Sequence, residues 1–529
     1  MTSPDLSRRN LLRGGLSGAA LLSLGGVTGG LLSGCSSDAG NQSDSSGGTP
    51  KRGGTLRLAL GGASQSDTLD SMKMTTVWDV VVAYNLYSRL LERVPSGTDD
   101  APMLETGPGL AEEVTYESPT SMVLRLREGV EFHHGKTVTA EDILFSLQRQ
   151  VDPKDPKSGA RDFSAVDFDS TKILDPRTIR LALKTPDTFL RIRLPSTANV
   201  IVPTDFDPRK PVGTGPFKLD SFEPGRSVKF SRFENYFEHD GPYLDRLEVL
   251  AFADASAQVN ALISGAADAL GNVPPAQVKV LEKNQAYEVH RSKSGGAGGF
   301  AMRTQTSPLS DPRVREAMRL LIDRESVVSQ CYNGEAVVAN DLFNPTDPAY
   351  AADLAVRDYD PDRAKSLLAE AGVSPAELTL AVGNLVPNIE VVYAESAKAG
   401  GMRLKVTNVD DSTFYSDHYG VDPLFSTLWY ARPIAEMINL TQLSDSPFAE
   451  TQPGDQQAAL YEQAASSLDE KQQNELLRQM QQIQYDSGGY VLPVYPNQID
   501  AASVKVKGLG KDGSGRPFGS YNFLETWMA

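Results

Sequence analysis

The first thirty-five residues constrain the fold most, because their pattern removes them from the folded body. Arg8, Arg9 and Arg13 precede a run without charged side chains from 14 to 34, and that run ends in Leu32-Ser33-Gly34-Cys35. A cationic segment, an apolar segment and small residues before a cleavage point are typical of an export signal. Residues 1–35 are therefore predicted to direct export, and the fold begins after them.

Two further features of this segment bear on how it is interpreted. The run has about the ~20 residues that a membrane-spanning helix needs, but it holds eight glycines, which make a poor helix. Ser7-Arg8-Arg9-Asn10-Leu11-Leu12 looks like a twin-arginine signal, which a receptor reads as an address. An ordinary secretory leader with two arginines by chance stays open.

The end of the leader resembles a bacterial lipobox, in which Cys35 is lipidated and becomes the new N-terminus. Each acyl chain contributes ~0.8 kcal/mol per buried methylene, and more than one chain gives a durable anchor. Residues 36–50 contain no aliphatic side chain larger than alanine, so they are predicted to be a flexible tether. The expected location is extracytoplasmic, at the outer face of the bacterial cytoplasmic membrane, with lipid as the only membrane contact.

Length, charge and cysteine usage narrow the class of protein. A chain of 529 residues exceeds the ~250–300 at which one core stops growing, so two or three domains are expected. A formal net charge of −17 argues against nucleic acid as a partner. If Cys35 carries lipid, Cys331 is the one cysteine left, so no intramolecular disulfide can form. Cys331 is interpreted as a small buried side chain rather than a nucleophile.

Periodic apolar residues predict a mixed α/β body with several sheets. Thr139-Ala-Glu-Asp142 has the form of a helix capping box, and Asp311-Pro312 is an N-cap followed by proline at the first helical position. A helix from 388 to 400 between two strands indicates a βαβ-like unit with parallel pairing. Strands are predicted where apolar residues alternate, at 55–60, 123–127, 179–183, 378–382 and 404–406.

The sequence contains no complete motif for binding a nucleotide or a metal. Gly135-Lys136-Thr137 lies one residue too far from Gly129 for a phosphate loop, and the glycines at 296–299 are followed by prolines before any helix could hold a pyrophosphate. The five histidines have no metal-binding spacing. No catalytic residue, metal site or cofactor is predicted, although paired carboxylates stay open because spacing in three dimensions is not visible in a sequence.

Several blocks together resemble the extracytoplasmic solute-binding proteins of the peptide/nickel class, family 5, which feed ABC importers. The longest, 123–149, is similar to the family signature almost throughout, with His134 where an aspartate is usual. The resemblance covers the chain from about Gly53 to its C-terminus. The other blocks are 110–113, 211–217, 260–268, 311–318 and 322–324.

The resemblance implies a two-lobed periplasmic-binding-protein-like α/β fold of type II, with an extra N-terminal subdomain and a cleft between the lobes. The subdomain would be inserted at 91–205, and lobe II would span 298–495. The glycines at 295–299 would form a flexible crossing between the lobes. Lobe I would be discontinuous, assembled from 51–90, 206–297 and 496–529.

The same resemblance points to binding residues. Peptide binders of the family have a tryptophan and, three residues on, an aspartate that pairs with the peptide α-ammonium. Here Trp429 is in place, but Arg432 stands where the acid is expected. Arginine binds carboxylate or phosphate, so a ligand with an anionic or neutral group there is predicted. The alternative is a local misalignment that leaves Arg432 a solvated loop residue. Tyr430, Tyr84 and Asn85 complete the predicted ligand-binding set.

The predicted function is that of a monomeric, non-enzymatic substrate-binding lipoprotein. It would capture an oligopeptide-like small solute by lobe closure and deliver it to an ABC permease and ATPase complex. Two alternatives stay open, a surface lipoprotein that senses peptides without transport and an envelope hydrolase on a similar scaffold. The ligand itself is not readable, because peptides, sugars, nickel chelates and opine-like solutes all use this fold.

Overall fold

The computed structural model describes residues 49–529 except 75, 99–100, 239–240, 374–375, 385, 387, 411–412, 447 and 453. The described residues belong to one compact unit, residues 47–529. The predicted leader, lipidated Cys35 and most of the tether lie outside the described residues. Within the described part of the chain, no helix is both long enough and apolar enough to cross a bilayer.

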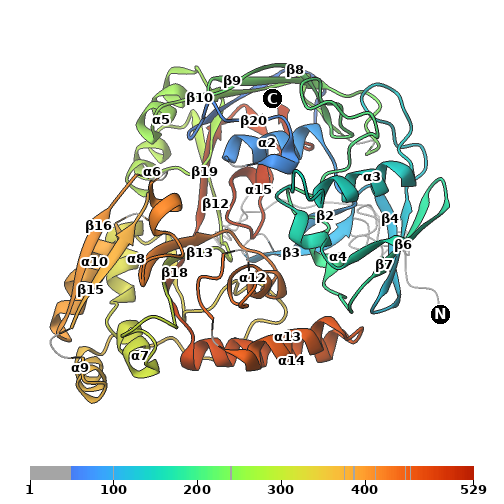
Figure 1. Ribbon diagram of the computed structural model, residues 1–529. Coiled ribbons are helices and arrows are strands. Elements are labelled where there is room, and N and C mark those ends of the chain that lie inside the picture. Colours follow the sequence, from blue (N-terminus) through green and yellow to red (C-terminus); the bar gives the residue numbers. More distant parts are fainter. Residues whose placement is uncertain are drawn as a thin grey trace, which may run out of the picture. The chain divides into compact units, whose positions relative to one another are not determined.

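The first sheet is assembled from distant segments of the chain (Figure 1). Its order is β12-β19-β11-β1-β10-β9-β8, with β1 parallel to both β10 and β11. Leu56 and Leu58 are fully buried, which confirms the alternation predicted there. The strands are β1 (Thr55–Leu60), β8 (Phe217–Glu223), β9 (Ser227–Arg232), β10 (Arg246–Ala251), β11 (Ala269–Leu270), β12 (Tyr287–Ser292) and β19 (Gln498–Ser503).

The second sheet has the order β14-β18-β13-β17-β15-β16. Strands β15 and β16 pair in parallel on either side of α10 (Ile389–Ala399) in the chain, so the predicted βαβ-like unit is confirmed. The strands are β13 (Ala297–Met302), β14 (Ala336–Val338), β15 (Ala376–Val382), β16 (Met402–Asn408), β17 (Leu424–Trp429) and β18 (Tyr490–Pro496).

The glycine run predicted as a flexible crossing is partly strand. Gly298 and Gly299 are buried inside β13, between β17 and β18. A Cβ atom on Gly299 would lie 2.2 Å from the carbonyl oxygen of Val491. Glycine is therefore needed here for close approach of two strands, and the expectation of flexibility is wrong for these two positions.

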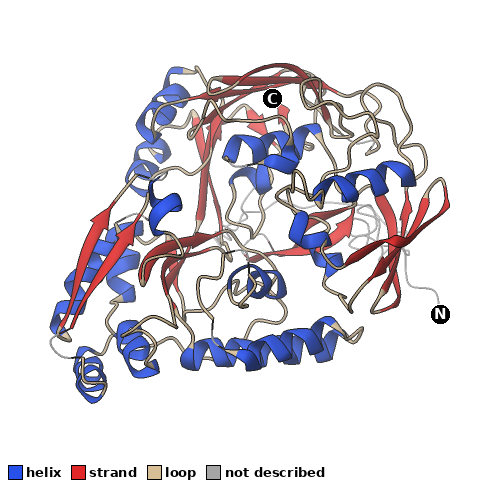
Figure 2. Cartoon of the chain, in the orientation of Figure 1, coloured by secondary structure: helices blue, strands red, loops and turns tan. Residues whose placement is uncertain are grey.

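A third, smaller sheet lies with its own helices (Figure 2). Its order is β4-β5-β7-β6, and α3 (Ala140–Gln150) begins at the predicted capping box, with both Thr139 and Asp142 hydrogen bonds present. The sheet strands and neighbouring short elements are β4 (Ala111–Ser118), β5 (Ser121–Leu126), β6 (Val166–Asp175), β7 (Thr178–Leu183), η2 (Ala160–Phe163), α4 (Leu190–Arg193) and the hairpin β2 (Leu91–Thr98)–β3 (Ala101–Pro108).

Helices cover these sheets, and α7 begins at Asp311 with proline in its first turn, as predicted. The chain is helical from Val77 to Leu86, and β2 begins at Leu91. The other elements are η1 (Ser71–Lys73), α2 (Val77–Leu86), α5 (Ala255–Ser264), α6 (Pro275–Glu282), α7 (Pro312–Leu320), α8 (Arg324–Tyr332), α9 (Pro361–Glu370), η3 (Phe414–His418), α12 (Ile434–Thr441), α13 (Asp455–Ala465), α14 (Glu470–Ser487), α15 (Pro517–Tyr521), β20 (Val506–Lys507) and β21 (Trp527–Met528).

Each sheet has its own hydrophobic core. Leu56 and Phe230 belong to the core of the first sheet, Phe300 and Tyr393 to that of the second, and Phe132 to that of the third. Separate cores under two large sheets are the arrangement expected of a two-lobed α/β protein. The residue ranges given above for the lobes and the inserted subdomain stay predictions.

Candidate ligand-binding site

The chain that leaves β17 carries three of the predicted binding residues, Trp429, Tyr430 and Arg432. One backbone hydrogen bond from this chain, and a second from the residues just before β13, reach the C-terminal segment. The N–H of Ala431 donates to the carbonyl of Ser514 at 2.8 Å, and the N–H of Gly295 donates to the carbonyl of Gly513 at 2.9 Å. The predicted residues therefore lie where the second sheet meets a segment that follows β19 of the first sheet.

Arg432 is held in an ion group rather than freely solvated. Its guanidinium donates to the carboxylate of Glu436, one helical turn on, and Arg93 of β2 donates to the same carboxylate at 2.8 Å. Only 27% of the Arg432 side chain and 5% of the Glu436 side chain are exposed. Two guanidiniums share one carboxylate, so these three residues, named here the Glu436 group, carry one positive charge.

A buried carboxylate fixes Trp429. Glu450 is fully buried and accepts hydrogen bonds from the indole N–H of Trp429 at 3.1 Å and from Thr427 at 2.6 Å. The hydroxyls of Tyr490, at 2.7 Å, and Tyr419 complete the set. Burial raises the pKa of Glu450, while these four donors lower it. No cationic side chain of the described residues forms an ion pair with Glu450, so its side-chain partners there are all neutral donors.

An aromatic surface continues from Trp429. The Trp429 ring meets Phe448 edge to face, with centroids 5.1 Å apart, and Phe448 lies 6.2 Å from Tyr419. Tyr419 in turn lies 5.4 Å from Tyr415. Phe448 is 43% exposed and Tyr415 is 54% exposed. This surface offers large contact area at small entropic cost to an apolar part of a ligand.

Tyr430 contacts a different partner. The guanidinium carbon of Arg516 lies 5.0 Å from the centroid of the Tyr430 ring. Arg516 also donates to the hydroxyl of Thr197 at 3.4 Å. Trp429 and Tyr430 thus face different arginines, since the guanidinium carbon of Arg432 lies 5.9 Å from the centroid of the Trp429 ring.

The two predicted residues of α2 behave differently from each other. The Tyr84 ring lies 4.3 Å from the guanidinium carbon of Arg89. Asn85 is fully buried, and its amide donates to the carbonyl of Val81 at 2.8 Å and to that of Tyr521 at 3.2 Å. Asn85 therefore positions α15 against α2, and its binding role stays a prediction.

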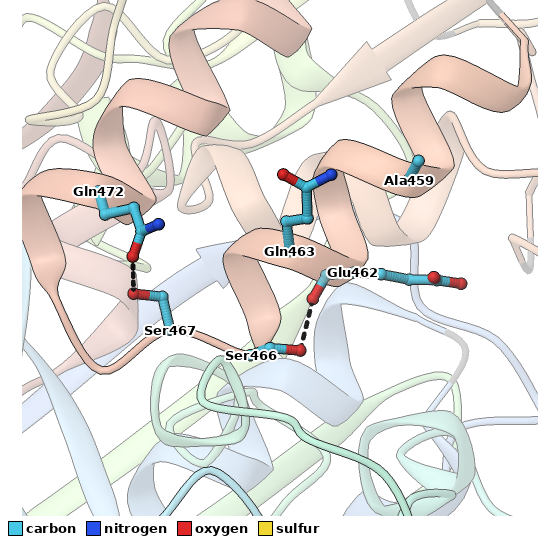
Figure 3. A pocket seen from close by; sticks show the side chains of 6 residues that line it. All are labelled: Ala459, Glu462, Gln463, Ser466, Ser467 and Gln472. Atoms are coloured by element: carbon cyan, nitrogen blue, oxygen red, sulfur yellow. Dashed lines mark hydrogen bonds between the residues drawn. The ribbon is translucent and has the colours of Figure 1, made fainter.

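A surface hollow lies elsewhere, at the turn between α13 and α14 (Figure 3). Ser466 donates to the carbonyl of Glu462, and Ser467 donates to the side chain of Gln472, both at 2.7 Å. The lining residues are Ala459, Glu462, Gln463, Ser466, Ser467 and Gln472. The hollow includes none of the predicted binding residues.

Solved structures establish the class of fold. The periplasmic binding protein DppA from Helicobacter pylori, in complex with the peptide STSA, superimposes with a TM-score of 0.77 at 22% identity, over 90% of this chain and 98% of that one. The two-lobed periplasmic-binding-protein-like fold predicted from the sequence is thereby confirmed.

Residues 105–447 match the family described as bacterial extracellular solute-binding proteins, family 5 middle. The chain belongs to this family, which confirms the resemblance seen in the sequence.

Curated relatives are described as binding proteins. Heme-binding protein A of Haemophilus influenzae is 29% identical over 315 residues, which cover 54% of this chain and 56% of that relative. The dipeptide-binding protein of Escherichia coli is 24% identical over 492 residues, covering 83% of this chain and 88% of the relative. The first match thus spans little more than half of the relative's length.

Proposed function

We propose that this protein is the substrate-binding lipoprotein of an ABC importer, and that it captures an oligopeptide-like solute without chemical change. The observation that carries the proposal is the Glu436 group beside the Trp429 surface. It joins Arg93 of the β2–β3 hairpin to α12, which follows the second sheet. A solute held there would contact parts of the chain that belong to different cores.

Lobe closure would follow from such contacts. A ligand shifts an equilibrium between open and closed states only by its differential affinity for the two. Residues from both sides of the site supply that difference, because they can all contact the solute only when the lobes are together. The importer would then recognise the closed form as the ligand-bound protein.

Arg432 sets the proposed ligand preference. The guanidinium of Arg432 repels an ammonium group and favours an anionic or neutral one. Family members with an acid at this position pair with a free peptide N-terminus, so this chain should not depend on one.

A tripeptide panel with free and acetylated N-termini tests this preference by calorimetry. We expect the acetylated peptides to bind at least as tightly as the free ones, and Arg432→Ala to weaken both by about tenfold, the equivalent of one lost charge-assisted contact. Arg478→Ala, an exposed arginine on α14, is the matched control. Tight binding that requires a free N-terminus and survives Arg432→Ala would refute the preference.

The anchor is tested separately, because it does not depend on the ligand. The wild-type chain should fractionate with membranes through Cys35, and Cys35→Ala should release it into the soluble fraction while leaving its ligand affinity unchanged. A Cys35→Ala protein that still fractionates with lipid would remove the anchor from the proposal.

A further inference from the structure

Arg516 is a guanidinium held by neutral groups. It immediately precedes α15, and its side chain lies over the Tyr430 ring and donates one long hydrogen bond, 3.4 Å, to Thr197. Among the described residues, no carboxylate forms an ion pair with it. An arginine has five donors in a planar fork, so most of the donors of Arg516 have no acceptor within the described protein.

Three separate parts of the chain meet at Arg516. Thr197 follows α4, in the part of the chain that carries the third sheet, and Tyr430 follows β17 of the second sheet. Arg516 itself belongs to the segment after β19 of the first sheet, and Figure 1 shows α15 beside α2. A group bound at Arg516 would therefore touch all three parts at once.

Tyr521 adds an independent sign of a missing partner. Its side chain is 1% exposed, and its hydroxyl has no hydrogen-bond partner among the described residues. Burial raises the pKa of Tyr521 well above its ordinary value, the Asp500 carboxylate raises it further, and Arg516 lowers it, so these groups lie within electrostatic range. A buried hydroxyl without a hydrogen-bond partner lowers the stability of the folded state, so its presence needs an explanation.

The nearest acids do not use the donors of Arg516. The carboxylate of Asp512 accepts from the N–H and hydroxyl of Ser514 and from the hydroxyl of Ser520 at 2.7 Å. The carboxylate of Asp500 accepts from the N–H of Phe518 at 2.8 Å. Burial raises the pKa of both acids, and Arg516 lowers that of Asp512, so Asp512 lies within electrostatic range of the guanidinium although it forms no ion pair with it.

We infer that Arg516, with Tyr521, Tyr430 and Thr197, anchors a carboxylate of the bound solute. This inference rests on the proposed function and narrows its substrate class to solutes with a free carboxylate. A carboxylate accepts two parallel bonds from a guanidinium and has further lone pairs for hydroxyl donors. It would therefore satisfy both the open fork of Arg516 and the unpartnered hydroxyl of Tyr521.

Calorimetry of the full chain with trialanine and with its C-terminal amide tests the inference, because the two probes differ only in the carboxylate. Trialanine should bind at least tenfold more tightly. Arg516→Gln should abolish this preference without changing the affinity for the amide, whereas Arg516→Lys should keep part of it. Arg478→Gln, exposed and remote from the site, should change nothing.

Tyr521→Phe separates a ligand contact from a structural one. If the hydroxyl serves only folding, its removal should lower the thermal midpoint and leave both affinities alone. We expect the reverse, a several-fold loss of trialanine affinity with no fall in the thermal midpoint, because the hydroxyl has no partner to lose.

The outcomes also separate this inference from the proposed function. Equal binding of trialanine and its amide, or an unchanged preference in Arg516→Gln, would overturn the carboxylate anchor and leave an oligopeptide binder in place. Failure of both probes to bind at millimolar concentration would instead refute the oligopeptide-like substrate, and the anchor with it.

Discussion

At the C-terminal end of α14, buried arginines donate to backbone carbonyls and carboxylates, whereas the guanidinium of Arg516, which lies over the Tyr430 ring, forms no ion pair with a described residue. Arg315 donates to the carbonyl of Ser487, and Arg319 donates to those of Tyr485 and Gly488. Cations at this position also interact favourably with the helix dipole. These arginines belong to the block 311–318 and its continuation, so that part of the family pattern is structural.

Asp341 is the buried carboxylate that accepts hydrogen bonds from two further arginines of this region. It is 1% exposed, accepts from Arg324 at 2.8 and 3.0 Å and from Arg357 at 3.2 Å, and also accepts the N–H of Leu492. Around Tyr430, by contrast, neutral donors hold Glu450, Asp500 and Asp512. Removing Asp341 would leave buried positive charge uncompensated, whereas Arg516, with only neutral hydrogen-bond partners among the described residues, is available to bind a charged ligand.

Removing the carboxylate of Asp341 should give the largest loss of stability. Asp341→Asn keeps the shape and tolerates the positive φ of this residue, but it leaves the buried guanidinium of Arg324 without its charge partner and Arg357 with Glu316 alone. We expect the free energy of unfolding to fall by ~3–5 kcal/mol in urea titrations, with ligand affinity unchanged at low temperature. Arg363→Gln, which breaks an exposed pair with Glu370, is the control, and an equal loss in both variants would contradict the contrast.

Glu450→Gln should have a smaller effect with a spectroscopic signature. The indole can only donate, and a glutamine amide directs N–H groups at donors that now face a carboxylate. We expect a loss of ~1.5–3 kcal/mol and a shift in tryptophan fluorescence. In a Trp429→Phe background the shift should vanish while the stability loss largely persists. A shift that survives there would assign it to another tryptophan.

The pH dependence of stability tests Asp500. Burial raises its pKa to about 7 from 3.8, so between these values the folded state binds a proton that the unfolded state releases. The stability that this bound proton contributes is complete below about pH 4 and is lost as the pH rises towards 7. The free energy of unfolding should change by at most ~1.4 kcal/mol per pH unit over this range. Asp500→Asn should flatten the unfolding free energy over this range. Identical slopes in both proteins would show that Asp500 ionises normally.

The smallest effect on stability is expected at the Glu436 group. Arg432→Gln leaves Glu436 paired with Arg93, and the Arg432 side chain is partly exposed, so the free energy of unfolding should change by no more than ~1 kcal/mol. Its effect should appear in ligand affinity instead. A stability loss as large as that of Asp341→Asn, with affinity intact, would place Arg432 with the structural arginines.

Local patterns in the sequence were sufficient for much of the fold. Alternation identified β1, β5, β7 and β15, and the caps at Thr139 and Asp311 located the starts of α3 and α7, because both signals arise within one turn or one strand. Close approach between strands has no such local sign, so the glycines of β13 were misinterpreted as flexible.

The binding region was predicted only where a family motif marks it. Trp429, Tyr430 and Arg432 lie in one short segment, but their partners come from elsewhere in the chain. Glu450 lies in a loop after α12, Arg93 in a hairpin, and Arg516 reaches Thr197 across 319 positions. No periodicity or spacing encodes such contacts, which exist only once the separate cores have formed.

The place of β19 in the first sheet has a consequence for the order of events during synthesis. This strand lies between β12 and β11, although it is made from residues 498–503. The ribosome must therefore release almost the whole polypeptide before the earliest sheet can be completed, and until then the edge of β11 stays open to wrong pairings. A nonsense change that removed only the final thirty-two residues would leave the amino-terminal half of the protein unfinished.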